Sequence, residues 1–149
     1  YKTSEVKRIF NCLRKKLGIE KYKELFEIIL TDNGWEFSKP SDIEIDPLTD
    51  EKTINVFYCE PYSSWQKGGI ERNHEFIRYI IPKGITFDNL SNENITCMMN
   101  NINNIKRKSM DFKTPYSIFT KIYGEKISKT LHLHHIDEEN VDLSYRILK

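Results

Sequence analysis

Asp32 and Glu71 occupy positions at which two carboxylates could share a divalent metal ion. Asp32 lies in the segment TDNG, directly after a short apolar run, and the Asn-Gly pair in that segment predicts a turn. It therefore stands at the carboxyl end of a predicted strand, where ligand sites gather in open α/β sheets. Glu71 lies in the first turn of a predicted helix that follows a glycine-containing loop. Because Mg²⁺ is typically held by one or two carboxylates plus substrate phosphate, the pair predicts a magnesium site.

The helix predicted over residues 69–81 has one polar and one apolar face. At roughly 100° per residue, Glu71, Glu75 and Arg78 share a polar arc of the helix. The apolar side carries the isoleucines Ile70, Ile77, Ile80 and Ile81. A surface helix ordinarily has this pattern, so periodicity alone does not identify a site. The order of the elements favours one: a strand ending in TDNG, a strand ending at a Pro-Tyr turn, then a loop and this helix.

Apolar periodicity and turn residues predict the elements that would position the two carboxylates. An amphipathic helix is expected over residues 4–17, with Ser4 as its cap and Gly18 at its end. β-branched apolar runs predict strands over 27–30 and 53–59. The other expected elements are a short helix over 20–26, a helical turn near 41–45, helices over 69–81 and 91–106, and a helix that ends before Gly124.

The last two helices carry the clearest end signals. Ser91 is the expected N-cap of the first, and Thr114 caps the second, with Pro115 in its first turn. The first is expected to bury Ile95, Met98, Met99, Ile102 and Ile105. The tail over 125–149 has no clear period, and its histidines (HLHH) are interpreted as solvated rather than as metal ligands.

The composition is that of one ordinary domain. The chain has 149 residues, of which 38% are hydrophobic and 30% charged. Its apolar runs are too short to span a membrane, and its first residues contain no apolar stretch of a signal peptide. Because it begins with Tyr1 rather than Met, we expect a piece of a longer protein. Three scattered cysteines, Cys12, Cys59 and Cys97, exclude a zinc ribbon and indicate small buried side chains in a reducing cytoplasm.

Two basic clusters have two interpretations each. Arg14-Lys15-Lys16 and Lys106-Arg107-Lys108 both fall near the end of a predicted helix. Cations there interact favourably with the helix dipole. The formal net charge of +1 does not decide between this role and DNA contact, since a nucleic-acid partner needs only a local patch.

Three segments resemble the integrase core of bacterial insertion-sequence transposases of the IS-thirty family. They are TDNGWEF, FYCEPYSSWQKGGIERNHEFIRYIIPKG and INNIKRKSMDFKTPY. The resemblance implies an α/β fold of the RNase H-like type, a mixed five-stranded sheet flanked by helices. It also implies that Asp32 and Glu71 are the second and third carboxylates of a DDE triad.

The resemblance further implies metal-dependent DNA cleavage and strand transfer with Mg²⁺ or Mn²⁺. Asp32 and Glu71 would be metal ligands in a two-metal mechanism. Arg78 would contact a phosphate or a DNA end. Trp65, Gln66 and Lys67 would lie in the loop beside the active site, where the Trp65 ring could stack on an unpaired base or pack under the loop.

The sequence departs from the family pattern in two ways, and each departure predicts a structural difference. The two carboxylates are further apart than is usual, so residues around 38–52 are expected to form a surface insertion. The first Asp, the opening strands and the N-terminal DNA-binding helices are expected to be missing, and Glu5 does not replace that Asp. The chain would then comprise the C-terminal part of a catalytic core (1–124) and a tail (125–149). Such a fragment is expected to be inactive alone.

The expected partner is DNA, both transposon ends and target, bound by a homo-oligomer at the bacterial nucleoid in the cytoplasm. Two rival functions stay open. The chain could be a non-catalytic remnant or DNA-docking module, or it could be an RNase H-like nuclease that does not join strands.

Two further residues have structural interpretations. Glu36, four residues after Asp32, is interpreted as supporting the fold or the site. His74 is expected to lie at the edge of the packed face of its helix.

Overall fold

A computed structural model of the chain describes residues 2–60 and 63–148, and only the backbone of Ser64 and Lys67. The chain forms two compact units, Tyr1–Lys67 and Gly68–Lys149. We call them the N-terminal and C-terminal units and describe each by itself. The boundary between a core and a tail that the sequence predicts at residue 124 stays a prediction.

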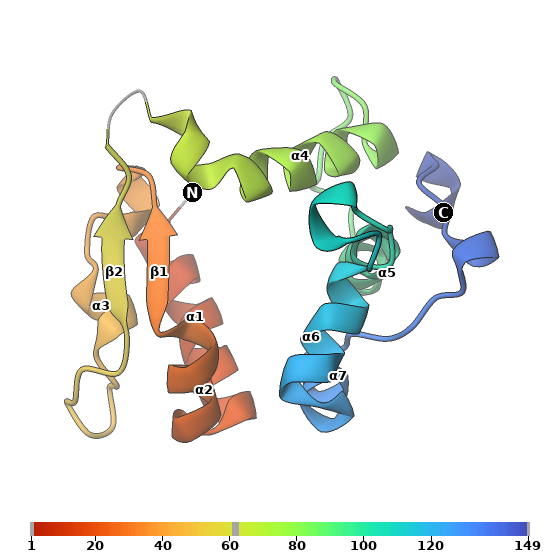
Figure 1. Cartoon of the computed structure of the whole chain (residues 1–149). Coiled ribbons are helices and arrows are strands. Elements are labelled where there is room, and N and C mark those ends of the chain that lie inside the picture. The colour runs from red at the N-terminus through yellow and green to blue at the C-terminus, as the bar shows by residue number, and fades with distance from the viewer. Residues whose placement is uncertain (1, 61–62, 149) are drawn as a thin grey trace. The chain divides into compact units, whose positions relative to one another are not determined.

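The N-terminal unit places helices against a two-stranded parallel sheet (Figure 1). Strand β1 pairs with β2 in a register that sets Leu30 beside Phe57. In chain order the elements are α1 (Thr3–Leu17), α2 (Ile19–Phe26), β1 (Ile28–Thr31), α3 (Ser41–Glu44) and β2 (Asn55–Tyr58), with 3-10 turns at Trp35–Phe37 and Ser64–Lys67. The predicted helices and strands are confirmed to within about two residues at their ends. The sheet is small, but the unit is α/β in character.

Side-chain alternation along the strands divides the sheet into a covered and an uncovered face. Ile29 and Val56 pack on the core around the fully buried Tyr22. The opposite face carries Ile28, which is 63% exposed, and Phe57, which is 52% exposed. Parallel sheets are ordinarily covered on both faces, so this face is unusual for an isolated unit.

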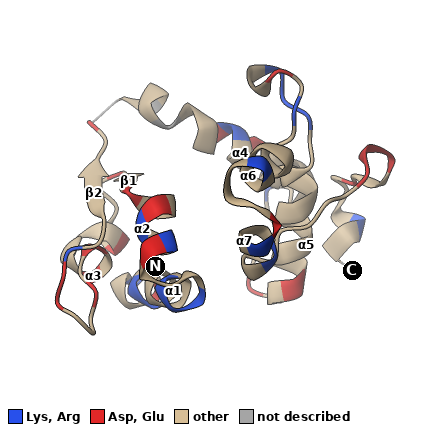
Figure 2. Cartoon of the chain, turned by 60° about the horizontal axis from the view of Figure 1, so that its bottom comes forward, with Lys and Arg blue, Asp and Glu red and all other residues tan. Residues whose placement is uncertain are grey.

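Arg14 belongs to the core of the N-terminal unit rather than to its surface. It is only 6% exposed, and its guanidinium donates to the carbonyl of Ile43 at 2.8 Å. The guanidinium carbon lies 4.7 Å from the centroid of the Tyr22 ring. Burial raises the pKa of Tyr22 to about 12. Helix α1 carries several Lys and Arg residues (Figure 2), but its basic cluster is divided, because Lys15 and Lys16 are exposed while Arg14 is internal.

Two sequence predictions about the N-terminal unit are wrong. Helix α1 begins at Thr3 after Lys2, and Ser4 does not cap it. Gly18 does end the helix, at a φ of 76° that favours glycine. Cys59 is buried as expected, but Cys12 is exposed on α1 because it lies on the side of the helix away from the core.

The C-terminal unit is helical (Figure 1). Its helices are α4 (Gly68–Ile80), α5 (Asn92–Asn103), α6 (Pro115–Tyr123) and α7 (Glu125–Thr130), with 3-10 turns at Lys108–Met110, Glu138–Asn140 and Tyr145–Leu148. Its core contains the buried side chains Ile80, Ile81, Met98, Ile102 and Leu148. Two predicted caps are confirmed: the Ser91 hydroxyl accepts from the amide of Asn94 at 3.1 Å, and Thr114 accepts from Ser117 at 3.0 Å. No helix in the described residues is long and apolar enough to cross a membrane.

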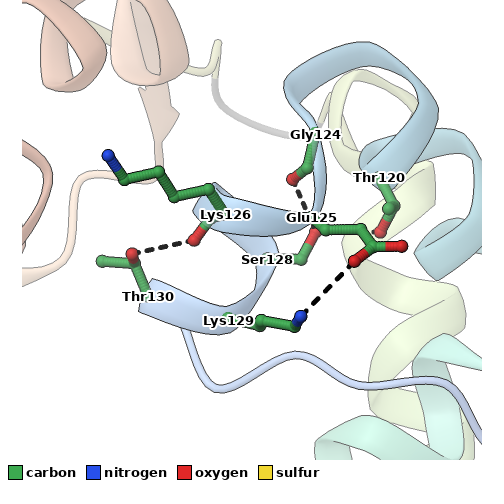
Figure 3. A network of polar contacts seen from close by, with 7 residues as sticks. All are labelled: Thr120, Gly124, Glu125, Lys126, Ser128, Lys129 and Thr130. Carbon is green, nitrogen blue, oxygen red and sulfur yellow. Dashed lines mark hydrogen bonds and ion pairs between the residues drawn. The ribbon is translucent and has the colours of Figure 1, made fainter.

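Helix α7 was not expected from the sequence, because six residues are too few to establish a period. Gly124, at a φ of 83°, separates it from α6. Hydroxyl contacts then hold the turn (Figure 3): the hydroxyls of Thr120 and Ser128 lie 2.8 Å apart, and Ser128 donates to the carbonyl of Gly124 at 3.2 Å. This helix depends on its local polar contacts more than on an apolar face.

Helix α5 ends three residues before the predicted end. Its last residue is Asn103, and the Asn104 side chain donates to the carbonyl of Asn100 at 2.9 Å. Lys106, Arg107 and Lys108 therefore lie beyond the helix. Ile95, predicted to be buried, is 43% exposed, whereas Met98 and Ile102 are buried as expected.

Two buried asparagines, Asn100 in α5 and Asn104 at its C-cap, bind the backbone of the C-terminal segment. Asn100 donates to the carbonyl of His132 at 2.9 Å and accepts from the amide of His134 at 3.0 Å. Asn104 repeats the pattern one turn later, donating to the carbonyl of His134 at 2.9 Å and accepting from Ile136 at 3.1 Å. Each side chain thus donates one hydrogen bond to the backbone of residues 132–136 and accepts one from it, as the backbone of a neighbouring β-strand would. The histidine side chains of this segment are exposed, although its backbone is held in place.

Candidate metal-ion and DNA site

Asp32 lies at the carboxyl end of the parallel sheet, as predicted. Strand β1 ends at the buried Thr31, whose carbonyl accepts from the amide of Cys59 at 2.7 Å just beyond β2. Asp32 is the next residue and is exposed. The buried strand end fixes the backbone of Asp32, and the residue itself is exposed to solvent.

Gly34 lies against two carboxylates. A β-carbon at this position would lie 3.1 Å from Oδ1 of Asp32 and 2.9 Å from Oε2 of Glu36. Because both oxygens lie this close to the same point, the carboxylates of Asp32 and Glu36 are neighbours. The φ of Gly34 is −63°, which any residue adopts, so the backbone does not require glycine here. Glycine is required because a larger side chain would collide with the two carboxylates. The segment TDNG-x-E thus brings Glu36 beside Asp32.

The 3-10 turn that carries Glu36 is tied to the sheet. The hydroxyl of Tyr58, the last residue of β2, donates to the carbonyl of Phe37 at 2.6 Å. The hydroxyl of Thr3 donates to the carbonyl of Trp35 at 3.4 Å. These bonds hold the turn on both sides, and they connect the position of Glu36 to the strand end that carries Asp32.

Glu71 lies in the first turn of α4 and Arg78 in its last turn, as predicted. Both side chains are exposed, and α4 is held by its apolar side, where Ile80 is fully buried. Ile70, predicted to be on the packed side, is 45% exposed, because it precedes the part of the helix that contacts the core. His74 is exposed.

The predicted loop residues are only partly described. Trp65 is 77% exposed and so does not pack under the loop. The side-chain oxygen of Gln66 accepts from the amide of Glu60 at 3.1 Å. The side chain of Lys67 lies outside the described residues, as do Pro61 and Tyr62.

The structure brings together some of the predicted site residues and leaves others in separate units. Asp32 and Glu36 lie together in the N-terminal unit, whereas Glu71 and Arg78 share one helix of the C-terminal unit. Within residues 2–60 and 63–148, no three His, Cys, Asp or Glu side chains are grouped so as to hold one metal ion. The donors present are nevertheless hard carboxylate oxygens, exposed at an element end, and these suit Mg²⁺ or Mn²⁺.

Comparison with known proteins identifies relatives whose sequences align with most of the chain. The transposase for insertion sequence element IS4351 of Bacteroides fragilis is 35% identical over 108 residues, which is 72% of this chain and 32% of that transposase. Transposase InsI for element IS30A of Escherichia coli K12 is 26% identical over 98 residues, or 66% of this chain and 24% of InsI. A putative integrase, ORF3 of Spiroplasma virus SpV1-R8A2 B, is 32% identical over 91 residues, covering 61% of this chain and 27% of the integrase.

The chain spans about a quarter to a third of the length of these relatives. No protein-family model matches it, and no solved structure matches it. The matches nevertheless agree with one another in kind, since each relative is a transposase or an integrase. The chain is therefore a relative of the bacterial insertion-sequence transposases, those of the IS30 elements among them.

Proposed function

We propose that this chain is part of the catalytic core of a DDE-type transposase, which cleaves transposon ends and joins them to target DNA. The observation that carries the proposal is the 35% identity to the Bacteroides fragilis transposase over 108 residues. The positions of the two carboxylates support it, one at a strand end and one in the first turn of a helix. The proposed fold of the complete core is RNase H-like.

Asp32 and Glu71 are the proposed metal ligands, and the bound Mg²⁺ or Mn²⁺ would supply charge neutralisation at the reacting phosphate. Asp32 is suited to this role because the buried Thr31 fixes its backbone. Phosphoryl transfer needs positioning and electrostatic stabilisation more than a protein nucleophile, so neither carboxylate attacks the DNA. Glu36, beside Asp32, would add negative charge next to that carboxylate rather than replace the first acid of the triad.

Of the DNA-binding residues proposed from the sequence, Trp65 and Arg78 are exposed and Gln66 is half-buried. Trp65 presents its ring to solvent, as stacking on an unpaired base requires. Arg78, two turns after Glu71, is exposed and available to a phosphate. Gln66 and Lys67 complete the proposed DNA contacts. A homo-oligomer at the bacterial nucleoid, in the cytoplasm, is the proposed working state.

The uncovered face of the N-terminal sheet supports the proposal that a complete core contains more structure than this chain. Ile28 and Phe57 are 63% and 52% exposed on that face. A two-stranded sheet is marginal alone, and apolar parallel strands are ordinarily covered on both sides. We therefore propose that the chain alone does not catalyse strand transfer, and that further elements of the catalytic core cover this face.

A DNA-docking module without catalysis is the second candidate. It is favoured by the absence, among the described residues, of three grouped metal-binding side chains. The complete gene product containing this chain distinguishes the two functions when incubated with a plasmid carrying the element's terminal repeats. The transposase proposal predicts cut and joined products with Mg²⁺ and none with EDTA. Binding without either product would support the docking module, and cutting without joining would support a nuclease.

Replacing Gly34 with alanine is expected to lower strand transfer roughly ten- to a hundredfold, because the new β-carbon displaces the carboxylates of Asp32 and Glu36. Stability is expected to change by less than about 1 kcal/mol, since alanine accepts this backbone conformation and the displaced groups are flexible side-chain ends. Activity and thermal unfolding are measured on the same preparation. Unchanged activity would show that the position of these carboxylates is unimportant.

A further inference from the structure

The second basic cluster, Lys106-Arg107-Lys108, is not explained by a helix dipole. Helix α5 ends at Asn103 with no basic residue in its last turn, and dipole interactions fall off within that turn. Lys106 pairs with the carboxylate of Glu138. Arg107 instead reaches helix α4, the helix that carries Glu71. The charge at Arg107 therefore needs a separate explanation.

Arg107 is held in a defined position against α4. Its Nη2 donates to Oδ1 of Asn73 at 2.8 Å, and its guanidinium carbon lies 5.3 Å from the centroid of the Phe76 ring. Its backbone is fixed by an antiparallel bridge to Lys113, whose carbonyl accepts from the amide of Arg107 at 3.0 Å. A guanidinium held in this way loses little entropy when it binds a ligand.

A second arginine contacts the same ring. The guanidinium carbon of Arg72 lies 5.5 Å from the centroid of Phe76, so the two cations are near neighbours across one side chain. Arg72 has an ion pair with Glu75 at 2.6 Å, but both side chains are more than half exposed, and such pairs are weak. Among the described residues, no carboxylate forms an ion pair with Arg107. The Nε atom of Arg107 is buried and has no hydrogen-bond partner among these residues.

The surroundings of Arg107 disfavour its charged form. Burial, and then the positive charge of Arg72, lower its pKa. The charge of Arg72 is near enough to contribute to this lowering, and an anion close to both guanidinium groups would oppose it. Planar guanidinium groups match the geometry of phosphate oxygens, which they bind through paired N–H donors. The missing counter-charge is therefore best supplied by a phosphate.

We infer that Arg72 and Arg107 bind the phosphodiester backbone of a DNA strand on helix α4, beside the turn that carries Glu71. Arg72 also borders a surface hollow of about 560 Å³, together with Glu75, Phe76, Tyr79 and Leu143. Tyr79 is 72% exposed there and offers an aromatic face to a sugar or a base. The inference rests on the proposed function, and it assigns DNA contacts distinct from Arg78 and from the loop at 65–67.

The test is the binding of a fluorescent DNA duplex to the 149-residue chain in EDTA, where metal-dependent chemistry is absent. Arg72→Gln and Arg107→Gln are each expected to weaken binding roughly tenfold, the typical loss for one charge-assisted contact. Each is also expected to reduce the slope of log K against log salt by about 0.9. The control is Lys126→Gln, which removes one exposed positive charge from α7 and is expected to bind normally.

Arg72→Gln decides the outcome, because this side chain is 65% exposed and its replacement is expected to leave the fold intact. Normal binding by that variant, an equal loss in Lys126→Gln, or no DNA binding by the unaltered chain would overturn the inference. Failure here is distinguishable from failure of the proposed function. The proposed function is tested by strand transfer in the complete gene product with Mg²⁺, whereas this binding assay in EDTA requires no metal-dependent chemistry.

Discussion

Glu71→Gln is expected to reduce strand transfer by the complete gene product about a thousandfold or more. The substitution keeps the size of the side chain and removes the negative charge that would hold the metal ion. Loss of one preorganised electrostatic contact at a reacting centre costs on the order of 10² to 10³ in rate, and loss of a metal ligand is expected to cost at least as much. Joined and cut DNA products are quantified separately on gels.

The matched control is Glu125→Gln, which changes an exposed glutamate of α7 whose partner is the equally exposed Lys129. It is expected to retain full activity, because exposed ion pairs contribute little. Asp32→Asn is expected to behave like Glu71→Gln. Retained strand transfer in either of these two variants would refute their assignment as metal ligands.

Asn100→Leu is expected to lower the free energy of unfolding of the C-terminal unit by about 3 kcal/mol. Asn100 is 1% exposed, and its amide bonds both the carbonyl of His132 and the amide of His134. Leucine would leave these two backbone groups unpaired, at about 1–3 kcal/mol each. Urea denaturation measures the loss, and limited proteolysis is expected to cut first within residues 132–148.

The control for this prediction is Asn92→Ala, at the exposed start of the same helix. Its effect is expected to stay within about 0.5 kcal/mol, as is usual for surface positions. If Asn100→Leu were as stable as the unaltered chain and equally resistant to protease, these hydrogen bonds would not hold the C-terminal segment.

The sequence predicted those elements whose signals are local. Helices α1, α4 and α6 have a clear apolar period or a capping residue, and strands β1 and β2 are short β-branched runs bounded by turns. The end of α5 was missed because asparagine, a weak helix former, here takes part in bonds to residues some thirty positions later. Such partners are invisible to periodicity.

The candidate site was predictable in part. The position of Asp32 follows from a strand that ends in TDNG, and the exposure of Glu71 and Arg78 follows from the polar arc of their helix. The close approach of Glu36 to Asp32 depends on the space at Gly34, which only the folded chain reveals. The basic clusters were predicted as equivalent, but packing separates them: Arg14 is in a core, whereas Arg107 lies against α4.

The central proposal is that Asp32 and Glu71 are both metal ligands in the complete gene product. Cleavage of the protein backbone by Fe²⁺ tests it directly when Fe²⁺ replaces Mg²⁺ in the complete gene product and ascorbate and peroxide are added. Because the radicals formed react close to the metal ion, we predict cuts near both residue 32 and residue 71, suppressed by excess Mg²⁺. Both cuts should disappear together in Asp32→Asn and in Glu71→Gln. Cutting near only one of the two residues, or cuts that survive both substitutions, would contradict the proposed assignment of Asp32 and Glu71 as metal ligands.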